Sequence, residues 1–231
     1  MKFKERLLQG TLIKRYKRFF VDISYNNKVI TGHCPNTGSM MGLLNKGSKV
    51  WFSKTDDPKR KLKYTLQIIE FNKKKIGINT LITNKIVREA LDQKKITKLN
   101  KFNNIKNEVK FNENTRFDFF LKNKKQKCFL EVKNVTLLRD KKTAEFPDAI
   151  TSRGTKHLNE LIKAKKKGYE AYILYLIQIE GCDSFKISND IDPEYKITFD
   201  KALKNGVKTL CYDCKLSNEE IKLSKQIKYE S

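Results

Sequence analysis

The sequence changes character near residue 82, from a run of short strands to a mixture of helices and strands. Before that point, short apolar and aromatic runs alternate with turn residues, and no helical period appears. Five short strands in about 80 residues are typical of a small barrel, and the OB-fold is the first candidate. The predicted strands lie at residues 12–25, 29–33, 49–52, 64–71 and 75–79.

Residues 83–231 favour a mixed-sheet α/β domain. Apolar residues recur at helical spacing between 86 and 91, with Thr83 or Asn84 as the expected cap. Asp192-Pro193 marks the start of another helix, with Pro at its first position. Between these helices we predict strands at 108–111, 115–121, 127–138 and 171–179 and a helix at 155–167, with a last strand at 207–214.

Three charged residues fall on two neighbouring strands of this second part. Asp118 lies in the first strand, and Glu131 and Lys133 lie two residues apart in the next. Because side chains alternate along a strand, Glu131 and Lys133 point to the same face. If the strands pair as a hairpin through the polar turn at 123–126, Asp118 lies beside Glu131. Two carboxylates and an ammonium then share one patch of sheet.

This patch predicts a divalent metal site with phosphodiesterase chemistry. Two close carboxylates repel each other unless a cation lies between them, and hard oxygen ligands favour Mg²⁺ or Mn²⁺. The expected ligands are Asp118, Glu131 and the carbonyl of Val132, whose backbone lies beside the carboxylates. Lys133 alongside can orient a water or stabilise charge on a phosphate.

An aspartate separated by twelve residues from Glu-x-Lys resembles the core of the PD-(D/E)XK nuclease superfamily. Here Asp118 follows Phe117 where that motif has proline, and the Pro147-Asp148 pair comes after the Glu-x-Lys. The superfamily often supplies a further ligand from its first helix, which implies a role for Glu89; a solvent-exposed glutamate is the alternative.

Eight stretches, in order over nearly the whole chain, carry a second resemblance. They are GTLIKRYKRFFVDI (10–23), HCPNTGSMMGLL (33–44), DDPKRKLKYT (56–65), INTLITNKIVREAL (78–91), RFDFFL (116–121), EVKNVTL (131–137), FPDAITSRGTKHLNEL (146–161) and DIDPEY (190–195). Through them the chain resembles the sugar fermentation stimulation protein (SfsA) family. This resemblance implies an OB-like barrel, DNA binding, an influence on sugar utilisation and a nuclease-like second domain.

The formal charge of +24 makes a polyanion the natural partner, with nucleic acid first and an anionic membrane surface second. Lysine-rich coding in an A+T-rich genome explains part of that charge. We expect DNA, duplex or single-stranded, to bind with weak sequence preference, because no helix-turn-helix or zinc finger is present. A solvated basic face is the alternative. The expected contacts are Lys14, Arg15, Lys17, Arg18, Lys59, Arg60, Lys61 and Lys156.

The loop at 34–42, CPNTGSMMG, has the composition of a tight anion-binding turn or of an ordinary one. Five cysteines, an odd number, favour reduced thiols. No apolar stretch is long enough to cross a bilayer, and the first residues lack a signal-peptide core. A cytoplasmic protein without a membrane partner is expected.

Two functions remain open from the residues alone. The first is a DNA-binding protein with a Mg²⁺-dependent phosphodiesterase site. The second is a non-catalytic DNA-binding regulator of sugar metabolism whose nuclease-like site is vestigial.

Overall fold

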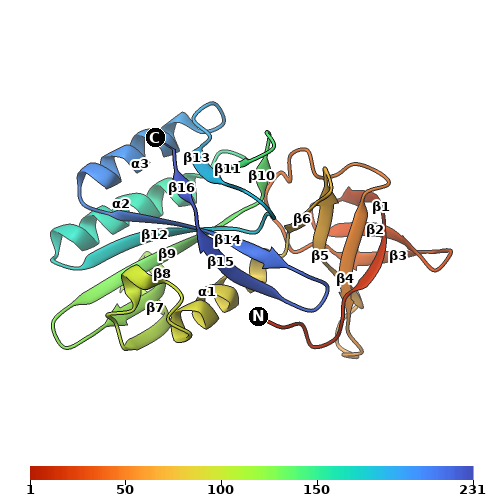
Figure 1. Cartoon of the computed structure of the whole chain (residues 1–231), viewed down its shortest axis with the longest axis horizontal. Helices are drawn as coiled ribbons and strands as arrows, with labels where there is room; N and C mark the ends of the chain where they lie inside the picture. Colours follow the sequence, from red (N-terminus) through yellow and green to blue (C-terminus); the bar gives the residue numbers. More distant parts are fainter. Residues whose placement is uncertain (231) are drawn as a thin grey trace.

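The first six strands pair in the order β3-β2-β1-β4-β5-β6 in the computed structural model, which describes residues 1–230. A parallel pairing of β3 with β5 closes five of them into a barrel, and β6 extends from β5 (Figure 1). The predicted OB-like barrel is thereby confirmed. The strands are β1 (Leu8–Tyr16), β2 (Phe20–Tyr25), β3 (Lys28–His33), β4 (Lys49–Lys54), β5 (Tyr64–Phe71) and β6 (Lys74–Gly77).

The single strand predicted for residues 12–25 is wrong, because the chain reverses inside it. Lys17 and Arg18 have φ of 44° and 61°, so two successive residues in the left-handed region join β1 to β2 as a hairpin. The Nε of Arg15 donates to the carbonyl of Arg18 at 2.8 Å across this turn. The turn contains no Gly, Pro or Asn, the residues by which such turns are recognised in a sequence.

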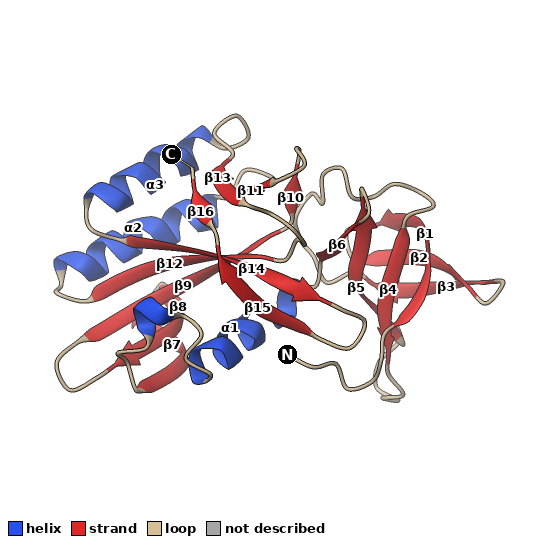
Figure 2. Cartoon of the chain, in the orientation of Figure 1, coloured by secondary structure: helices blue, strands red, loops and turns tan. Residues whose placement is uncertain are grey.

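The second part is an α/β domain around a mixed sheet with the order β15-β14-β12-β9-β8-β7. β12 lies parallel to β9 and β14, and the outer strands are antiparallel. Helix α1 (Thr83–Asp92) packs on one face, and α2 (Ser152–Lys166) and α3 (Pro193–Lys204) lie over the other (Figure 2). The strands are β7 (Asn104–Asn112), β8 (Thr115–Lys122), β9 (Lys127–Val135), β12 (Glu170–Ile177), β14 (Lys208–Leu216) and β15 (Ile221–Gln226).

Two of the three helices begin with a side-chain cap. Asp192 accepts from the N–H of Tyr195 at 3.0 Å ahead of α3, as the Asp-Pro pair predicts, and Thr151 accepts from Gly154 ahead of α2. The expected cap of α1 by Thr83 or Asn84 is wrong. A 3₁₀ turn, η1 (Thr80–Ile82), runs straight into α1, so the capping side chain is that of Asn79 before η1. A second such turn, η2 (Thr97–Leu99), follows α1.

A third, small sheet was not predicted. It has the order β10-β11-β13-β16 and lies between α3 and the barrel (Figure 1). Each of its strands has two to four residues, too few for alternation of side chains to show in the sequence. The strands are β10 (Leu137–Leu138), β11 (Thr143–Phe146), β13 (Ser184–Ile187) and β16 (Lys228–Tyr229).

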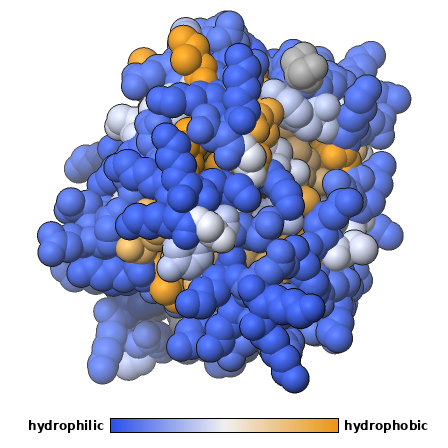
Figure 3. Space-filling view, turned by 90° about the vertical axis from the view of Figure 1, so that its left-hand side faces the viewer, coloured by the Kyte–Doolittle hydropathy of each residue, from blue (hydrophilic) through white to orange (hydrophobic). Residues whose placement is uncertain are grey.

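Barrel and α/β domain are joined by contacts far apart in sequence. Ile76 of β6 pairs with Ile179, and the N–H of Gly77 donates to the carbonyl of Gln178 at 2.8 Å. The segment before β1 lies against the β14–β15 turn, where Phe3 and Leu7 donate to the carbonyls of Glu219 and Asn218. The α/β face turned away from the barrel is largely hydrophilic (Figure 3). Within residues 1–230, no helix has the length and apolarity to span a membrane.

Candidate metal and phosphodiester site

Asp118 lies where the β8–β9 hairpin opens. The pairing starts at the predicted turn, with Lys122 opposite Lys127, and ends with Phe119 opposite Leu130. One residue before Phe119 in β8, the Oδ2 of Asp118 accepts from the backbone N–H of Val132 at 2.7 Å. The carboxylate thus takes the place of a backbone acceptor between the two strands. This local geometry brings Asp118 to the residue that follows Glu131, as the strand pattern predicts.

Helix α1 contributes an amide to Asp118. The Nδ2 of Asn84 donates to Oδ1 of Asp118 at 2.7 Å. Glu89, considered as a further metal ligand, instead has its carboxylate 2.9 Å from the amino group of Met1, and its side chain is 40% exposed. Asn84 was missed as a site residue. Its position in the first turn of α1 was its only signal, and that was assigned to capping.

Glu131 and Lys133 form a buried pair on the α2 side of the sheet. The Nζ of Lys133 lies 2.7 Å from Oε1 of Glu131, and their side chains are 12% and 4% exposed. The Nδ1 of His157 on α2 contacts the same Glu131 oxygen and lies 3.4 Å from the Lys133 ammonium. His157 precedes Leu158 and stands one turn before Leu161, both fully buried, which is the signal that it faces inward.

The two carboxyl groups differ in the ease with which they ionise. Burial, followed by the nearby charge of Glu131, raises the pKa of Asp118 to about 6. Burial also acts to raise the pKa of Glu131, but the Lys133 ammonium and the hydrogen bond from His157 lower it below its usual value. Near neutral pH both groups are therefore largely ionised, and the negative charge on Asp118 is poorly compensated.

Oε2 of Glu131 is buried and has no hydrogen-bond partner among residues 1–230. A buried carboxylate oxygen without a partner is costly unless a cation or a proton donor reaches it. Within the same residues there is no cluster of three Asp, Glu, His or Cys side chains in metal-binding geometry. Two carboxylates without a third are enough for Mg²⁺, which keeps several waters and completes its shell with substrate phosphate. Asp118 and Glu131 therefore fit such an ion.

Cations surround the entrance to Asp118. A cavity of about 260 Å³ is lined by Asp118, Glu108, Arg116 and Arg153, and a neighbouring one of about 390 Å³ by Arg116, Arg153 and Lys156. Arg116 lies 3.5 Å from Glu108, and Lys156 donates to the carbonyl of Asn114. Arg153, in the first turn of α2, has no hydrogen-bond or ion-pair partner in residues 1–230 and was not selected from the sequence. The cavities beside Asp118 are therefore lined by arginine and lysine side chains.

The predicted basic segment on β1 and β2 is largely occupied by contacts within the barrel. The guanidinium of Arg15 donates to the carbonyls of Asn36, Gly38 and Ser39 at 2.7–3.4 Å. Arg18 donates to the carbonyl of Thr37 at 3.1 Å. Lys14 lies 3.7 Å from Asp22, and Lys17 is exposed in the hairpin turn. Arg15 holds the loop at 34–42 in place, which leaves its donors little capacity for a phosphate.

The second predicted basic segment lies between β4 and β5. Lys59 and Lys61 are exposed, and Arg60 donates to the hydroxyl of Thr65 at 3.1 Å.

The loop at 34–42 does hold an anion, but that anion is a carboxylate of the protein itself. Asp148 accepts from the backbone N–H of Met40 at 3.1 Å and from the hydroxyl of Ser39 at 3.3 Å.

Comparison with known proteins agrees with this two-part architecture. Residues 13–78 match the family model "SfsA N-terminal OB domain", and residues 81–220 match "Sugar fermentation stimulation protein RE domain". A sugar fermentation stimulation protein homolog of Pelagibacter ubique (strain HTCC1062) is 54% identical, with 99% of this chain and 98% of that protein covered. A homolog of Ruegeria sp. (strain TM1040) is 42% identical, with coverages of 96% and 97%.

Among solved structures, that of Pyrococcus furiosus SfsA in complex with Ca²⁺ superposes with a TM-score of 0.89. The match covers 100% of this chain and 98% of that one at 24% sequence identity, so it shows that the two proteins share a fold.

Proposed function

Because the chain belongs to the sugar fermentation stimulation protein family, we propose that it is a DNA-binding protein that hydrolyses phosphodiesters with a divalent cation. The observation that carries this proposal is the buried, unpartnered Oε2 of Glu131 next to Asp118 and Lys133. Ca²⁺ in the Pyrococcus furiosus relative supports a cation in this fold. Mg²⁺ and Mn²⁺ favour the same hard oxygen ligands, and they are the ions we propose here.

Asp118 and Glu131 would hold the ion, which when bound would polarise a phosphoryl oxygen and lower the pKa of a water. The protein's own residues have distinct tasks. Asn84 and the N–H of Val132 fix the Asp118 carboxylate, and His157 fixes that of Glu131. The Lys133 ammonium supplies a positive charge next to the attacked phosphate, where it orients water and stabilises charge developing on oxygen. Arg153 and Arg116 draw the phosphate toward the cavity at Asp118.

Binding to DNA rests on the charge of +24 and on exposed cations in both parts of the molecule. Lys59 and Lys61 on the barrel and Lys156 and Arg153 at the α2 end are the proposed phosphate contacts. Contacts of this kind carry no sequence information, so weak sequence preference is expected. The five cysteines are free and buried, as suits a reducing compartment such as the cytoplasm.

The regulator hypothesis is favoured by a different observation. The Lys133 ammonium is already paired with Glu131, and both Asp118 oxygens accept hydrogen bonds within the protein. Because these charged groups are already paired within the protein, the site suits a structural ion that supports DNA binding without hydrolysis of the DNA.

Calorimetry with Mn²⁺ tests the ion, and nicking of supercoiled plasmid with degradation of single strands tests the chemistry. Wild-type protein should bind one ion, and Asp118→Asn should weaken binding about tenfold or more by halving the carboxylate charge. Glu108→Gln, which removes a carboxylate at the rim of the same cavity, is the matched control and should bind like wild type. Equal affinity of wild type and Asp118→Asn would reject the site. Ion binding without cleavage of any DNA form would favour the regulator.

A further inference from the structure

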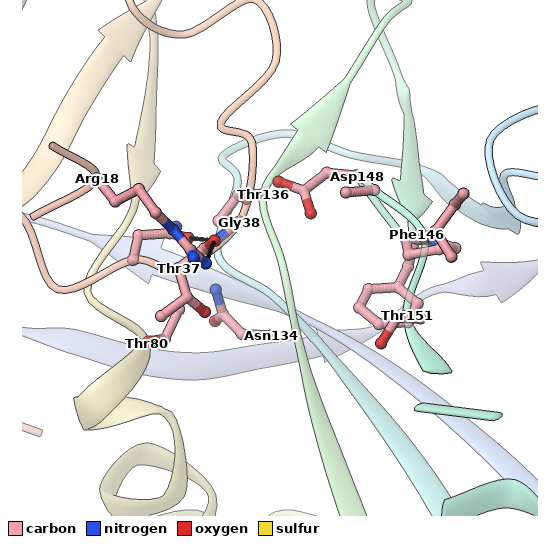
Figure 4. A pocket seen from close by; sticks show the side chains of 13 residues that line it. Arg18, Thr37, Gly38, Thr80, Asn134, Thr136, Phe146, Asp148 and Thr151 are labelled. Atoms are coloured by element: carbon pink, nitrogen blue, oxygen red, sulfur yellow. Dashed lines mark hydrogen bonds between the residues drawn. The ribbon is translucent and has the colours of Figure 1, made fainter. Parts of the chain in front are cut away.

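A cavity of about 340 Å³ lies between the barrel and the α/β domain (Figure 4). Arg18 and Thr37 form its barrel wall, and Asn134 at the end of β9 forms its floor. Asn134 directly follows Lys133 in the strand. Thr151 also lines the cavity, two residues before Arg153, which lines the cavity at Asp118. The linings of the two cavities therefore meet at the start of α2.

The cavity is lined mainly by uncharged hydrogen-bonding groups, unlike the cationic rim of the carboxylate site. The Oδ1 of Asn134 accepts from Gln178 Nε2 at 2.5 Å and from Thr83 Oγ1 at 3.2 Å. These bonds fix the amide so that its Nδ2 donors have no partner among residues 1–230. The hydroxyl of Thr136 likewise makes no hydrogen bond within those residues. Neutral donors and acceptors of this kind match the edge of a nucleobase better than a phosphate.

The lining includes a flat group, the guanidinium of Arg18, and an exposed apolar side chain, that of Ile150. The guanidinium of Arg18 lies 5.8 Å from the centroid of the Phe19 ring, and both side chains are solvent-exposed. Ile150 lines the cavity and is 81% exposed; Leu81, which is 69% exposed, follows the lining residue Thr80. Bases stack on aromatic rings and on guanidinium planes. Arg18 and Ile150 therefore offer stacking surface beside the hydrogen-bonding groups of the same cavity.

The two walls are held at a fixed separation. Asp148 on the α/β side binds Ser39 and Met40 on the barrel side. A Cβ at Gly38 would lie 2.6 Å from the Asp148 carboxylate, so a larger residue there would push that carboxylate out of its present position. The cavity exists before any ligand arrives, as is usual for small-molecule and nucleotide sites of this size.

We infer that this cavity receives the base of one unpaired deoxynucleotide, next to the phosphate that lies at Asp118 and Glu131. The inference rests on the proposed function and narrows its substrate class to single-stranded DNA or unpaired strand ends. A base inside a duplex is stacked and paired, and it enters a cavity between two domains only by leaving the helix. Continuous duplex therefore binds through surface cations alone.

The test is the affinity of the full protein, in EDTA, for a short labelled single strand and for the matching duplex. Ala149→Trp fills the cavity from an exposed lining position that has no polar group to lose. It should weaken single-strand binding about tenfold, the effect of losing one stacked base, and leave duplex binding and Mn²⁺ binding within about twofold. Ile197→Trp, on the exposed face of α3, is the control for an added indole and should change neither affinity.

Thr136→Val is the second variant, because it removes the hydroxyl while keeping the shape of the side chain. It should weaken single-strand binding about threefold, the effect of one hydrogen bond. Loss of single-strand and duplex affinity to the same extent in Ala149→Trp, or no loss at all, would overturn the inference. Displacement of the strand by dAMP at similar concentration would assign the cavity to free nucleotides and also overturn it.

Failure of this inference is distinguishable from failure of the proposed function. If the wild type cleaves DNA and Ala149→Trp binds single strands as tightly as the wild type, only the cavity assignment is rejected. If the wild type cleaves no DNA, but Ala149→Trp binds single strands selectively more weakly than the wild type, the cavity assignment stands and hydrolysis is rejected.

Discussion

Charge in the sequence pointed to two regions, the carboxylate site on β8 and β9 and the basic hairpin of β1 and β2. The two regions differ in whether their charged side chains lie as the sequence predicts. On β9, Glu131 and Lys133 face the same side and touch, as their spacing predicts. On β1, Arg15 turns inward to the carbonyls of a neighbouring loop. Spacing along one strand determines which side chains share a face. A count of cations says nothing about which of their donors the protein already uses.

The largest expected effect is the fall in cleavage rate when the Lys133 ammonium is removed. That fall would confirm that the carboxylate site carries out the hydrolysis. Where wild type cleaves DNA, Lys133→Ala should lower the cleavage rate about 100-fold or more, because it removes charge stabilisation in a buried site. DNA affinity should stay within about twofold, since one of 50 basic residues is lost. Lys110→Ala, at the cationic rim, is the matched control. Cleavage that persists in both Lys133→Ala and Glu131→Gln would indicate a contaminant or another site.

Arg15→Ala tests the basic hairpin as a structural element. Loss of its guanidinium leaves several loop carbonyls without donors and should lower the free energy of unfolding by about 2 kcal/mol. Lys17→Ala, in the exposed turn, should change it by less than about 0.5 kcal/mol. Thermal and urea unfolding measure both variants. Arg15→Ala with wild-type stability and a flatter salt dependence of DNA binding would instead make Arg15 a phosphate contact.

The pH dependence of stability tests the strain in the metal-free carboxylate site. The pKa of Asp118 is raised to about 6 in the folded protein, above the unfolded value near 3.8. The contribution of this carboxyl group to the free energy of unfolding is therefore fully present below pH 3.8 and is lost as the pH rises through about 6. In EDTA at pH 8, Asp118→Asn should therefore be more stable than wild type by about 1–2 kcal/mol, with allowance for partial exposure. The difference should vanish near pH 4.

Added Mn²⁺ should reverse that difference at pH 8, because the ion stabilises the folded wild type and binds the variant less well. A proton must leave Asp118 for the ion to bind, so Mn²⁺ affinity should rise with pH up to about 6 and then level off. Wild type more stable than Asp118→Asn at pH 8 in EDTA would contradict the raised pKa.

The smallest expected effect concerns the cations that remain free on the barrel. Lys59→Ala combined with Lys61→Ala should reduce the slope of log affinity against log salt by about 1–2, because each phosphate that a lysine neutralises contributes about 0.7–0.9 to that slope. Lys46→Ala combined with Lys73→Ala, two exposed lysines of other barrel loops, serves as the control. An unchanged slope in the first pair would move the DNA path away from this loop.

Local rules predicted much of the fold. The closed barrel, the β8–β9 hairpin and the Asp192 cap of α3 follow from turn residues, alternation and capping, and all three are present. The site needed more than these rules supply. Asn84 and His157 reach the carboxylates from helices that sequence patterns place only roughly in space. The β1–β2 turn lacks the usual turn residues, and the small third sheet depends on pairings between strands too short to recognise.

The first seven residues extend the barrel in sequence but lie on the α/β domain in space. Leu7, Trp51 and Ile68 share one buried cluster with residues of α1. Barrel and α/β domain should consequently unfold in a single cooperative transition, and separately produced halves should expose apolar surface where they were parted. We therefore expect neither half to fold stably without the other. A chimaera that borrows this barrel has to supply a substitute for the docking edge at residues 218–220.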